Sequence, residues 1–365
     1  MFEGYLLSKT GKRLAVLGQF DLDAGLSLNG VGAIKVTLAA ASLPKPLLDM
    51  RLAIYRRIGE QQKLLGGTTW LIRKIGRSLD QSGRRELTLW AEGPNTLLKR
   101  RWVAYPANSD QTHKLGPADD MMKAVVRENM GNLAAVIERD WSVWLRVAND
   151  SGRGPVVEKE MAWRQVLAVL QEIGQVAEAA GTAVYFDIAA ISEQQFEFRT
   201  YIGLRGVDRS RPGNIGFVVL SPENGSVVDG DLDWDGADEA TWVYAAGQGT
   251  GDSRLIGEAG DNGRIASSPF GRIEIVEQTN NIGTQEGLDE EAIALLQARR
   301  PRRLVKLSLA DAPGLQAGIH YDLGDKVAWI FEGDGGTAIV ETMKYRQKSG
   351  KIEIDAELRT DADDE

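Results

Sequence analysis

Short segments in which apolar and polar residues alternate occur at both ends of this chain. In the last of them Ile352, Ile354, Ala356 and Leu358 point to one side, and charged residues between them point to the other. Residues 86–92 show the same alternation. A period of two residues is typical of a β-strand with one buried face and one solvent-exposed face. The pattern therefore predicts half-buried β-sheet at both ends of the chain.

The middle of the chain has a different period. Apolar residues recur at helical spacing over 117–131 and from about 158 to 180, and a third helix is expected over 287–300. Strands are expected at 14–20, 33–38, 52–57, 70–75 and 86–91, and again from 214 onwards. We predict an α+β, mostly β fold. Its expected domains are a β domain at 1–106, an α+β domain at 107–213 and a second β domain at 214–365 that contains the third helix.

Composition limits the environment of the protein. The 365 residues include no cysteine, which excludes disulfides, thiolate nucleophiles and cysteine-based zinc sites. There is no apolar run of the length that crosses a bilayer, and the N-terminal residues lack the pattern of a signal peptide. We therefore expect no membrane anchor and no secretion by that route, and assembly in a reducing cytoplasm fits.

The balance of charge disfavours nucleic-acid binding by electrostatic attraction. Fifty-two acidic and 43 basic side chains give a net charge of −9, and a surface of that sign repels phosphates. Two local basic clusters exist, and solvated faces or subunit contacts are the favoured interpretation, with phosphate binding as the alternative. They consist of Lys99, Arg100 and Arg101, and of Arg299, Arg300, Arg302 and Arg303.

No catalytic constellation can be assembled from the sequence. The two histidines, His113 and His320, lie far apart in polar, turn-rich segments, so neither a multi-histidine metal site nor a serine triad is expected. A glycosidase-type carboxylate pair stays open, because the sequence fixes no spacing between carboxylates in space. The nine tryptophans are expected in cores or subunit interfaces, with a carbohydrate-stacking platform as the alternative. No cofactor is expected.

Two further motifs have an ordinary structural interpretation. Asp231, Asp233 and Asp235 followed by Gly236 match the opening of a calcium loop, but Trp242 stands where the bidentate glutamate should be. An acidic turn is therefore favoured. The glycine-rich segment 247–254 lacks the Gly-Lys-Ser/Thr ending of a phosphate loop, which favours a tight connection between strands.

Several segments, taken in order, resemble the tail hub (baseplate hub) proteins of long-tailed phages of the siphophage type. They are LTLWAEGPNTLLKRRWV at 87–103, GPADDMMKAVVRENMG at 116–131, AWRQVLAVLQEIGQVAEAAGTAVYFDI at 162–188, FEFRTYIGLRGVDRS at 196–210, WVYAAGQGTGDSR at 242–254 and YDLGDKV at 321–327. The resemblance implies two tube-type antiparallel β-barrel domains with an inserted α+β domain.

The resemblance also implies a structural virion protein at the tail tip, assembled in the host cytoplasm. Such a protein forms a homotrimeric ring that adapts the six-fold tail tube to the three-fold tip and lines the DNA ejection channel. The implied partners are the distal tail protein ring, the tape-measure protein and tail-tip fibre or spike proteins, and viral DNA passes through without specific binding. The alternatives are a tail-associated cell-wall hydrolase and a carbohydrate-binding host-recognition module.

A channel for DNA should not hold phosphates, because each lysine contact adds affinity and therefore friction. From this requirement we expect a set of acidic side chains on polar strand faces to line the channel, and the two basic clusters to face neighbouring subunits. The acidic set is Glu86, Glu92, Glu353, Asp355 and Glu357.

Overall fold

The computed structural model of the protein describes residues 1–39, 43–79, 81, 83, 85–104, 112–161, 163–279 and 282–360. Strands account for 45% of the chain and helices for 18%, which confirms a mostly β protein with a few helices. The expected boundary near residue 106 and the acidic tail at 361–365 lie outside the described residues. Among those described, no helix is long and apolar enough to cross a bilayer.

The N-terminal strands form an antiparallel sheet in the order β3-β4-β8-β7-β5-β1-β2, with β6 beside β5. Their inward residues are apolar and buried, as the alternation in β8 predicted. A short 3-10 turn, η2 (Leu65–Gly67), precedes β7. The strands are β1 (Phe2–Leu7), β2 (Arg13–Val16), β3 (Phe20–Ser27), β4 (Ala33–Ala39), β5 (Arg51–Ile58), β6 (Gln61–Leu64), β7 (Trp70–Leu79) and β8 (Arg85–Glu92).

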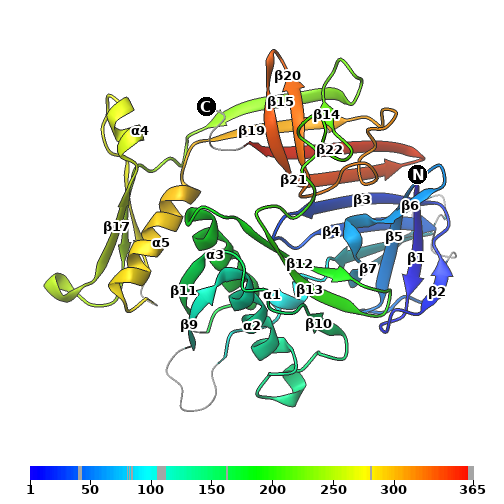
Figure 1. The fold of residues 1–365 in the computed structure, drawn as a ribbon. Helices are drawn as coiled ribbons and strands as arrows, with labels where there is room; N and C mark the ends of the chain where they lie inside the picture. The colour runs from blue at the N-terminus through cyan, green and yellow to red at the C-terminus, as the bar shows by residue number, and fades with distance from the viewer. Residues whose placement is uncertain are drawn as a thin grey trace.

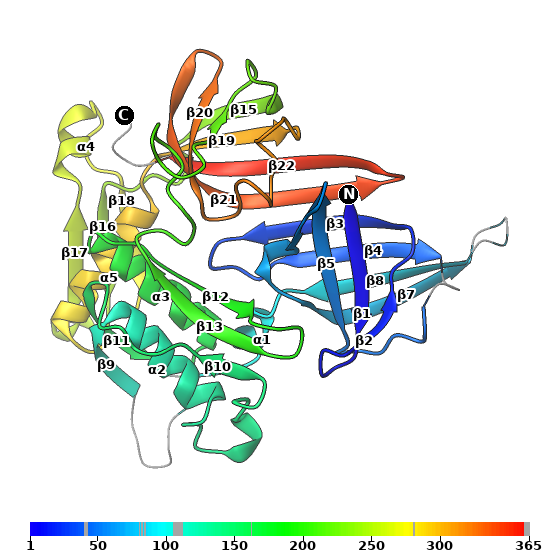
Figure 2. The ribbon, with the colours of Figure 1, turned by 45° about the vertical axis from the view of Figure 1, so that its right-hand side comes forward.

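The C-terminal strands continue the same sheet. Strand β21 pairs antiparallel with β3, with Tyr345 opposite Ala24, so strands from the two ends of the chain lie side by side (Figures 1 and 2). One apolar core runs through both halves. The C-terminal strands are β14 (Val219–Leu220), β15 (Val227–Asp235), β19 (Arg302–Leu309), β20 (Lys326–Phe331), β21 (Asp334–Lys348) and β22 (Lys351–Thr360).

The resulting 14-stranded sheet is open. Its order runs β15-β19-β22-β21-β3-β4-β8-β7-β5-β1-β2, with β20 and β14 branching from β21. Within the described residues, β15 and β2 each pair on one side only, and the sheet does not close on itself. The expectation of two barrels is thus not confirmed.

The middle of the chain forms a helical module with its own core. Its sheets have the orders β10-β13-β12 and β11-β9, and β12 and β13 pair antiparallel. The first helix is confirmed, but the second begins at Val166 and not near Glu158, because 156–161 belong to a strand. The elements are α1 (Thr96–Lys99), β9 (Thr112–Pro117), α2 (Ala118–Met130), η3 (Ile137–Arg139), β10 (Leu145–Val147), β11 (Val156–Met161), α3 (Val166–Ala179), β12 (Val184–Ala190) and β13 (Phe196–Ile202).

Between β15 and β19 lies a small inserted module, at the left of Figure 1, with a separate apolar core. Helix α5, close to the expected 287–300, packs on the three-stranded sheet β17-β16-β18. Gly257 permits this packing, since a Cβ there would lie 2.2 Å from the backbone of Leu288. The elements are β16 (Trp242–Ala246), η4 (Gly251–Ser253), β17 (Ile256–Gly260), α4 (Asn262–Ser267), β18 (Glu274–Gln278) and α5 (Gln285–Ala298).

Candidate interaction surfaces

The five acidic side chains singled out from the sequence share one face of the large sheet. Strand register decides this, because directly paired residues lie on the same face. Asp355 pairs with Lys344, and the row continues through Gly25 and Ala33 to Glu92. The other three lie on this face because they follow at alternate positions of β8 and β22. They are Glu86, Glu353 and Glu357. We call this side of the sheet the polar face.

The polar face also carries basic side chains, so it is not uniformly acidic. Lys344 contacts Glu357 at 3.6 Å, and Arg346 contacts Asp355 at 3.0 Å. Lys351 approaches Glu353 at 2.8 Å, and this hydrogen bond and the lysine charge lower the pKa of Glu353. Exposed pairs of this kind contribute little to stability, because solvent screens them. The face therefore mixes opposite charges, because these pairs lie beside the exposed lysines Lys35 and Lys348 on the same face.

The first basic cluster is partly used within the chain. Arg101 stacks on the ring of Trp141 at 3.9 Å and donates to the carbonyl of Glu138. Arg100 lies 3.9 Å from Asp49, and Lys99, at the end of α1, is exposed. Partial burial lowers the pKa of both arginines. The surface available to a neighbour here consists mainly of Lys99 and Arg100.

The second basic cluster follows α5 and is divided between two environments. Arg299 caps the helix, and Arg300 is exposed, 3.3 Å from Asp261. Arg303 is nearly buried and pairs with Asp334. The side chain of Arg302 lies outside the described residues. The four arginines thus do not form one exposed patch.

The two motifs weighed in the sequence have structural roles. Asp231, Asp233 and Asp235 lie in strand β15 and not in a loop, and the described residues contain no group able to hold a metal ion. The glycine-rich segment 247–254 connects the antiparallel strands β16 and β17, and Arg254 donates to the carbonyl of Gly247 at 3.0 Å. This confirms the tight connection.

Histidines and tryptophans do not gather into a site. His113 contacts Glu158 at 2.5 Å on the surface, and the ring of His320 accepts a bond within its own turn. Trp70 and Trp329 are buried in the large core. Four indoles are largely exposed, an outcome that the helix and strand patterns did not reveal; they are Trp102, Trp144, Trp163 and Trp234.

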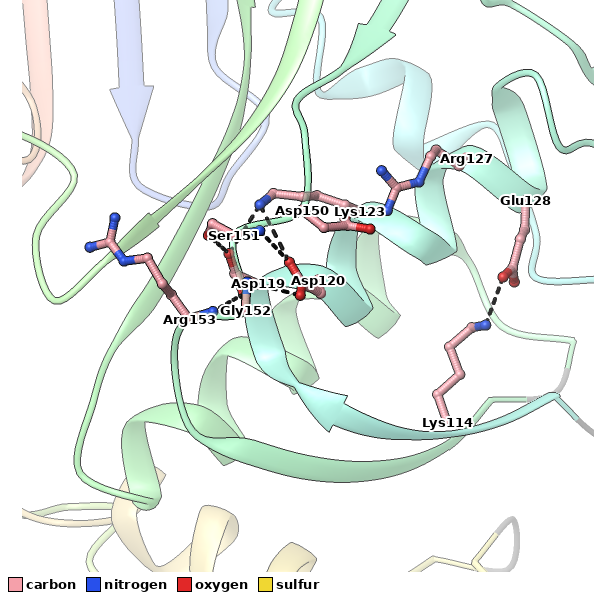
Figure 3. Close-up of polar contacts among 10 residues, drawn as sticks. All are labelled: Lys114, Asp119, Asp120, Lys123, Arg127, Glu128, Asp150, Ser151, Gly152 and Arg153. Atoms are coloured by element: carbon pink, nitrogen blue, oxygen red, sulfur yellow. Dashed lines mark hydrogen bonds and ion pairs between the residues drawn. The ribbon is translucent and has the colours of Figure 1, made fainter.

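A buried ion pair at the start of α2 holds the loop that leads to β11 (Figure 3). Lys123 donates to Asp119 at 3.0 Å, and both side chains are almost fully buried. Asp119 also accepts from the hydroxyl of Ser151 and from the backbone N–H of Arg153. Burial alone raises the pKa of Asp119, but these hydrogen bonds and the lysine charge hold it below its ordinary value. Asp120 accepts from the same loop at the helix N-terminus, where carboxylates are stabilised.

A second buried lysine joins the middle and inserted modules. Lys159 on β11 lies 3.2 Å from Glu172 on α3 and 3.1 Å from Glu291 on α5. Burial lowers the pKa of Lys159, while the carboxylate of Glu291 opposes this shift. Sequence reasoning missed this contact, because Lys159 was expected at the start of a helix and Glu291 lies 132 positions away in the chain.

The chain matches a known protein family along nearly its whole length. The family model is that of the Siphovirus ReqiPepy6 Gp37-like proteins, and it matches residues 10–358. No curated protein matches the chain significantly.

Solved phage tail proteins share the fold at low sequence identity. The 43 kDa tail protein of prophage MuSo2 from Shewanella oneidensis superposes with a TM-score of 0.61 at 11% identity, over 98% of either chain. The tail protein from Neisseria meningitidis MC58 gives 0.59 at 13% identity, over 99% of this chain and 97% of that one. The prophage tail protein gp18 from Listeria monocytogenes EGD-e gives 0.53 at 11% identity, over 99% and 95%.

Proposed function

Because the chain belongs to the family of Siphovirus ReqiPepy6 Gp37-like proteins, we propose that it is the structural hub of a siphophage tail tip. In this role three copies form a ring that joins the six-fold tail tube to the three-fold tip and surrounds the path of the ejected DNA. The fold that it shares with solved phage tail proteins supports the proposal. The role is structural and not enzymatic.

The observation that carries the proposal is the open order of the large sheet. Strands β15 and β2 end the sheet, and unpaired backbone groups at such edges accept a further strand. A contact between unlike edges of two copies is heterologous, and its repetition about an axis closes a ring. Pairing of β15 with β2 of the next copy thus removes the open edges at the two ends of the main strand order.

The charges at the two edges favour this pairing. Aspartates occupy alternate positions of β15 from Asp229 to Asp235, whereas Lys9 and Lys12 lie beside β2. Arg13 on β2 pairs with Glu193 of the same chain at 2.6 Å. Like edges repel and unlike edges attract, so complementary charge selects the head-to-tail contact. Exposed apolar side chains accompany the charges on both edges, namely Val228 on one, and Leu14 and Val16 on the other.

Each copy contributes two β halves to the ring, joined where β3 meets β21. Three copies then present six halves, which matches a six-fold tail above a three-fold tip. In this arrangement the polar face lines the channel, and its carboxylates, several of them paired with basic side chains of the same face, disfavour the binding of a DNA phosphate. The distal tail ring and tape-measure protein lie above the ring, and fibre or spike proteins lie below it.

Charge reversal at the two edges tests the proposal. Native mass spectrometry of the purified protein should show a trimer. Lys12→Glu and Asp231→Lys should each reduce the fraction of protein found as trimer, because each substitution places like charges in contact. The double variant should recover it, since the attraction is restored with reversed sign. Lys45→Glu, in an exposed loop between β4 and β5, is the matched control and should leave the trimer intact. A monomer at all concentrations, or equal loss in the single and double variants, would contradict the proposal.

A further inference from the structure

A cleft of about 640 Å³ lies where the modules meet. Helices α3 and α5 and strand β12 line one side of it, and the ends of β15, β19, β21 and β22 line the other. Sites for small ligands have volumes of roughly 300–1,000 Å³. The cleft therefore has the size of a ligand site, and the ring proposed above does not use it.

An exposed indole lies beside an arginine at this cleft. Arg303 lies between two aromatic rings, 5.0 Å from the centroid of buried Trp329 and 5.4 Å from that of Trp234. Trp234 lines the cleft and is 58% exposed. The stack fixes its position from one side, so the indole is a preorganised apolar surface beside polar groups.

The arginines of the cleft all have carboxylate partners. Arg359 donates to Glu178 at 2.6 Å and contacts Tyr185. Arg300 pairs with Asp261, and Arg303 pairs with Asp334. An anionic ligand would have to displace these carboxylates, which disfavours phosphates and nucleic acid. A neutral ligand needs no such exchange.

Free amides complete the lining. Among the described residues, the side chains of Gln175 on α3 and Gln297 on α5 have no hydrogen-bond partner within the protein. Each amide offers two donors and one acceptor oxygen. Such groups match ligand hydroxyls, which both donate and accept.

We propose that this cleft binds a neutral oligosaccharide. The apolar C–H face of one sugar ring stacks on Trp234, and hydroxyls of the sugar bond to the amides of Gln175 and Gln297. The ligand bridges the helical modules and the sheet. In the assembled tail tip, the cleft would recognise a glycan of the host surface, either the amino-sugar strand of the cell wall or a neutral hexose polysaccharide.

The cleft and the edge of β15 use different groups. Trp234 lies near the end of the strand, whereas Asp229 and Asp231 lie toward its start and on the polar face. If the four residues of β2 pair along Asp229 and Asp231, the Trp234 end of the nine-residue β15 stays unpaired. Glycan binding therefore does not require the ring to be broken.

Calorimetric titration of the full chain with chitotriose, cellotriose and maltotriose tests the proposal. We expect saturable binding of at least one in the millimolar range or tighter, with a change in tryptophan fluorescence. Preference for chitotriose identifies the amino-sugar strand, and preference for either hexose identifies a neutral polysaccharide. Trp234→Ala should weaken binding about tenfold or more, as expected of a central aromatic anchor.

Two variants separate binding from folding. Gln175→Ala, at an exposed helix position, should weaken binding without lowering the melting temperature. Trp144→Ala removes a comparably exposed indole that does not line the cleft and should leave binding unchanged. The proposal is overturned if none of the three sugars binds, if Trp234→Ala binds like the parent protein, or if only an anionic probe such as tripolyphosphate binds. Trimer mass is measured in the same samples, so failure of the ring and failure of the glycan site are distinguishable.

Discussion

At the scale of single residues, we expect the loss of the buried Asp119–Lys123 ion pair to lower the free energy of unfolding strongly. Both side chains are almost fully buried, and Asp119 also accepts hydrogen bonds from the 151–153 loop. Asp119→Ala leaves the lysine charge buried without its partner, so we expect a loss of about 3–5 kcal/mol in the free energy of unfolding. Urea denaturation measures it. Asp150→Ala, which removes an exposed partner of Arg127, is the control and should cost under about 1 kcal/mol.

The same pair should make stability depend on pH. The folded pKa of Asp119 lies below its ordinary value of 3.8, so its contribution is complete above that value and is lost as the pH falls through the folded pKa. The stability difference between the parent protein and Asp119→Asn should therefore shrink in acid. Denaturation at neutral pH and at about pH 2 measures this difference. A constant difference would show that the carboxylate does not titrate in this way.

Residue patterns predicted which strand positions are buried but not which charges are. Alternation correctly separated Ile354, Ala356 and Leu358 from their charged neighbours. Lys159 was expected at the start of a helix, yet it lies on β11 and is buried, because α5 brings Glu291 to it from a distant part of the chain. The residues next to Lys159 in the chain do not indicate such a partner. Likewise, the acids of β22 were predicted correctly as outward, whereas two of their basic partners, Lys344 and Arg346, come from the neighbouring strand β21.

At the scale of elements, Lys159 is expected to hold α5 against the middle module. Lys159→Met removes the cation shared by Glu172 and Glu291. We expect faster hydrogen exchange in α5 and β16–β18, with little change in the large sheet, because the inserted module has its own core. Lys114→Met removes a more exposed pair within the middle module and is the control. Unchanged exchange in α5 after Lys159→Met would show that apolar contacts alone fix the helix.

The seam between β3 and β21 should make the two β halves unfold together. Tyr345 lies in this seam, is fully buried and contacts Phe2 edge to face at 5.7 Å. Tyr345→Ala should cost about 3–5 kcal/mol, as for other buried aromatic truncations. Denaturation should keep a single transition for the sheet, since one core spans both halves. Tyr244→Ala, half-buried in the inserted module, is the control, and separate transitions of the two halves would contradict this account.

Long strongly periodic elements were predictable, and contacts between distant elements were not. Helices α2 and α5 and strands β8 and β22 follow from local periodicity. The start of α3 was placed too early, because residues 156–161 alternate weakly and contain charges that also suit a helix. Pairing of β3 with β21 joins residues over three hundred positions apart, and nothing in either strand specifies the other. That pairing turns two expected sheets into one.

At the scale of the whole molecule, the account depends on the two open edges of the sheet meeting between copies. Heterologous contacts give either a closed ring or an open chain, and the number of copies distinguishes them. The family match identifies the family of the protein, whereas the proposed ring rests on the edges of the sheet. In that proposed ring, the charges of the polar face would determine how DNA interacts with the channel wall.

Disulfide trapping between the edges tests this central claim most directly, because the chain contains no cysteine that would interfere. Val16→Cys and Val228→Cys place one thiol on each edge at an exposed apolar position. After mild oxidation, the double variant should give a covalent three-chain species on a non-reducing gel, while each single variant gives no three-chain species. A double variant that stays monomeric, or one that forms a ladder of ever longer species, would contradict the closed three-copy ring.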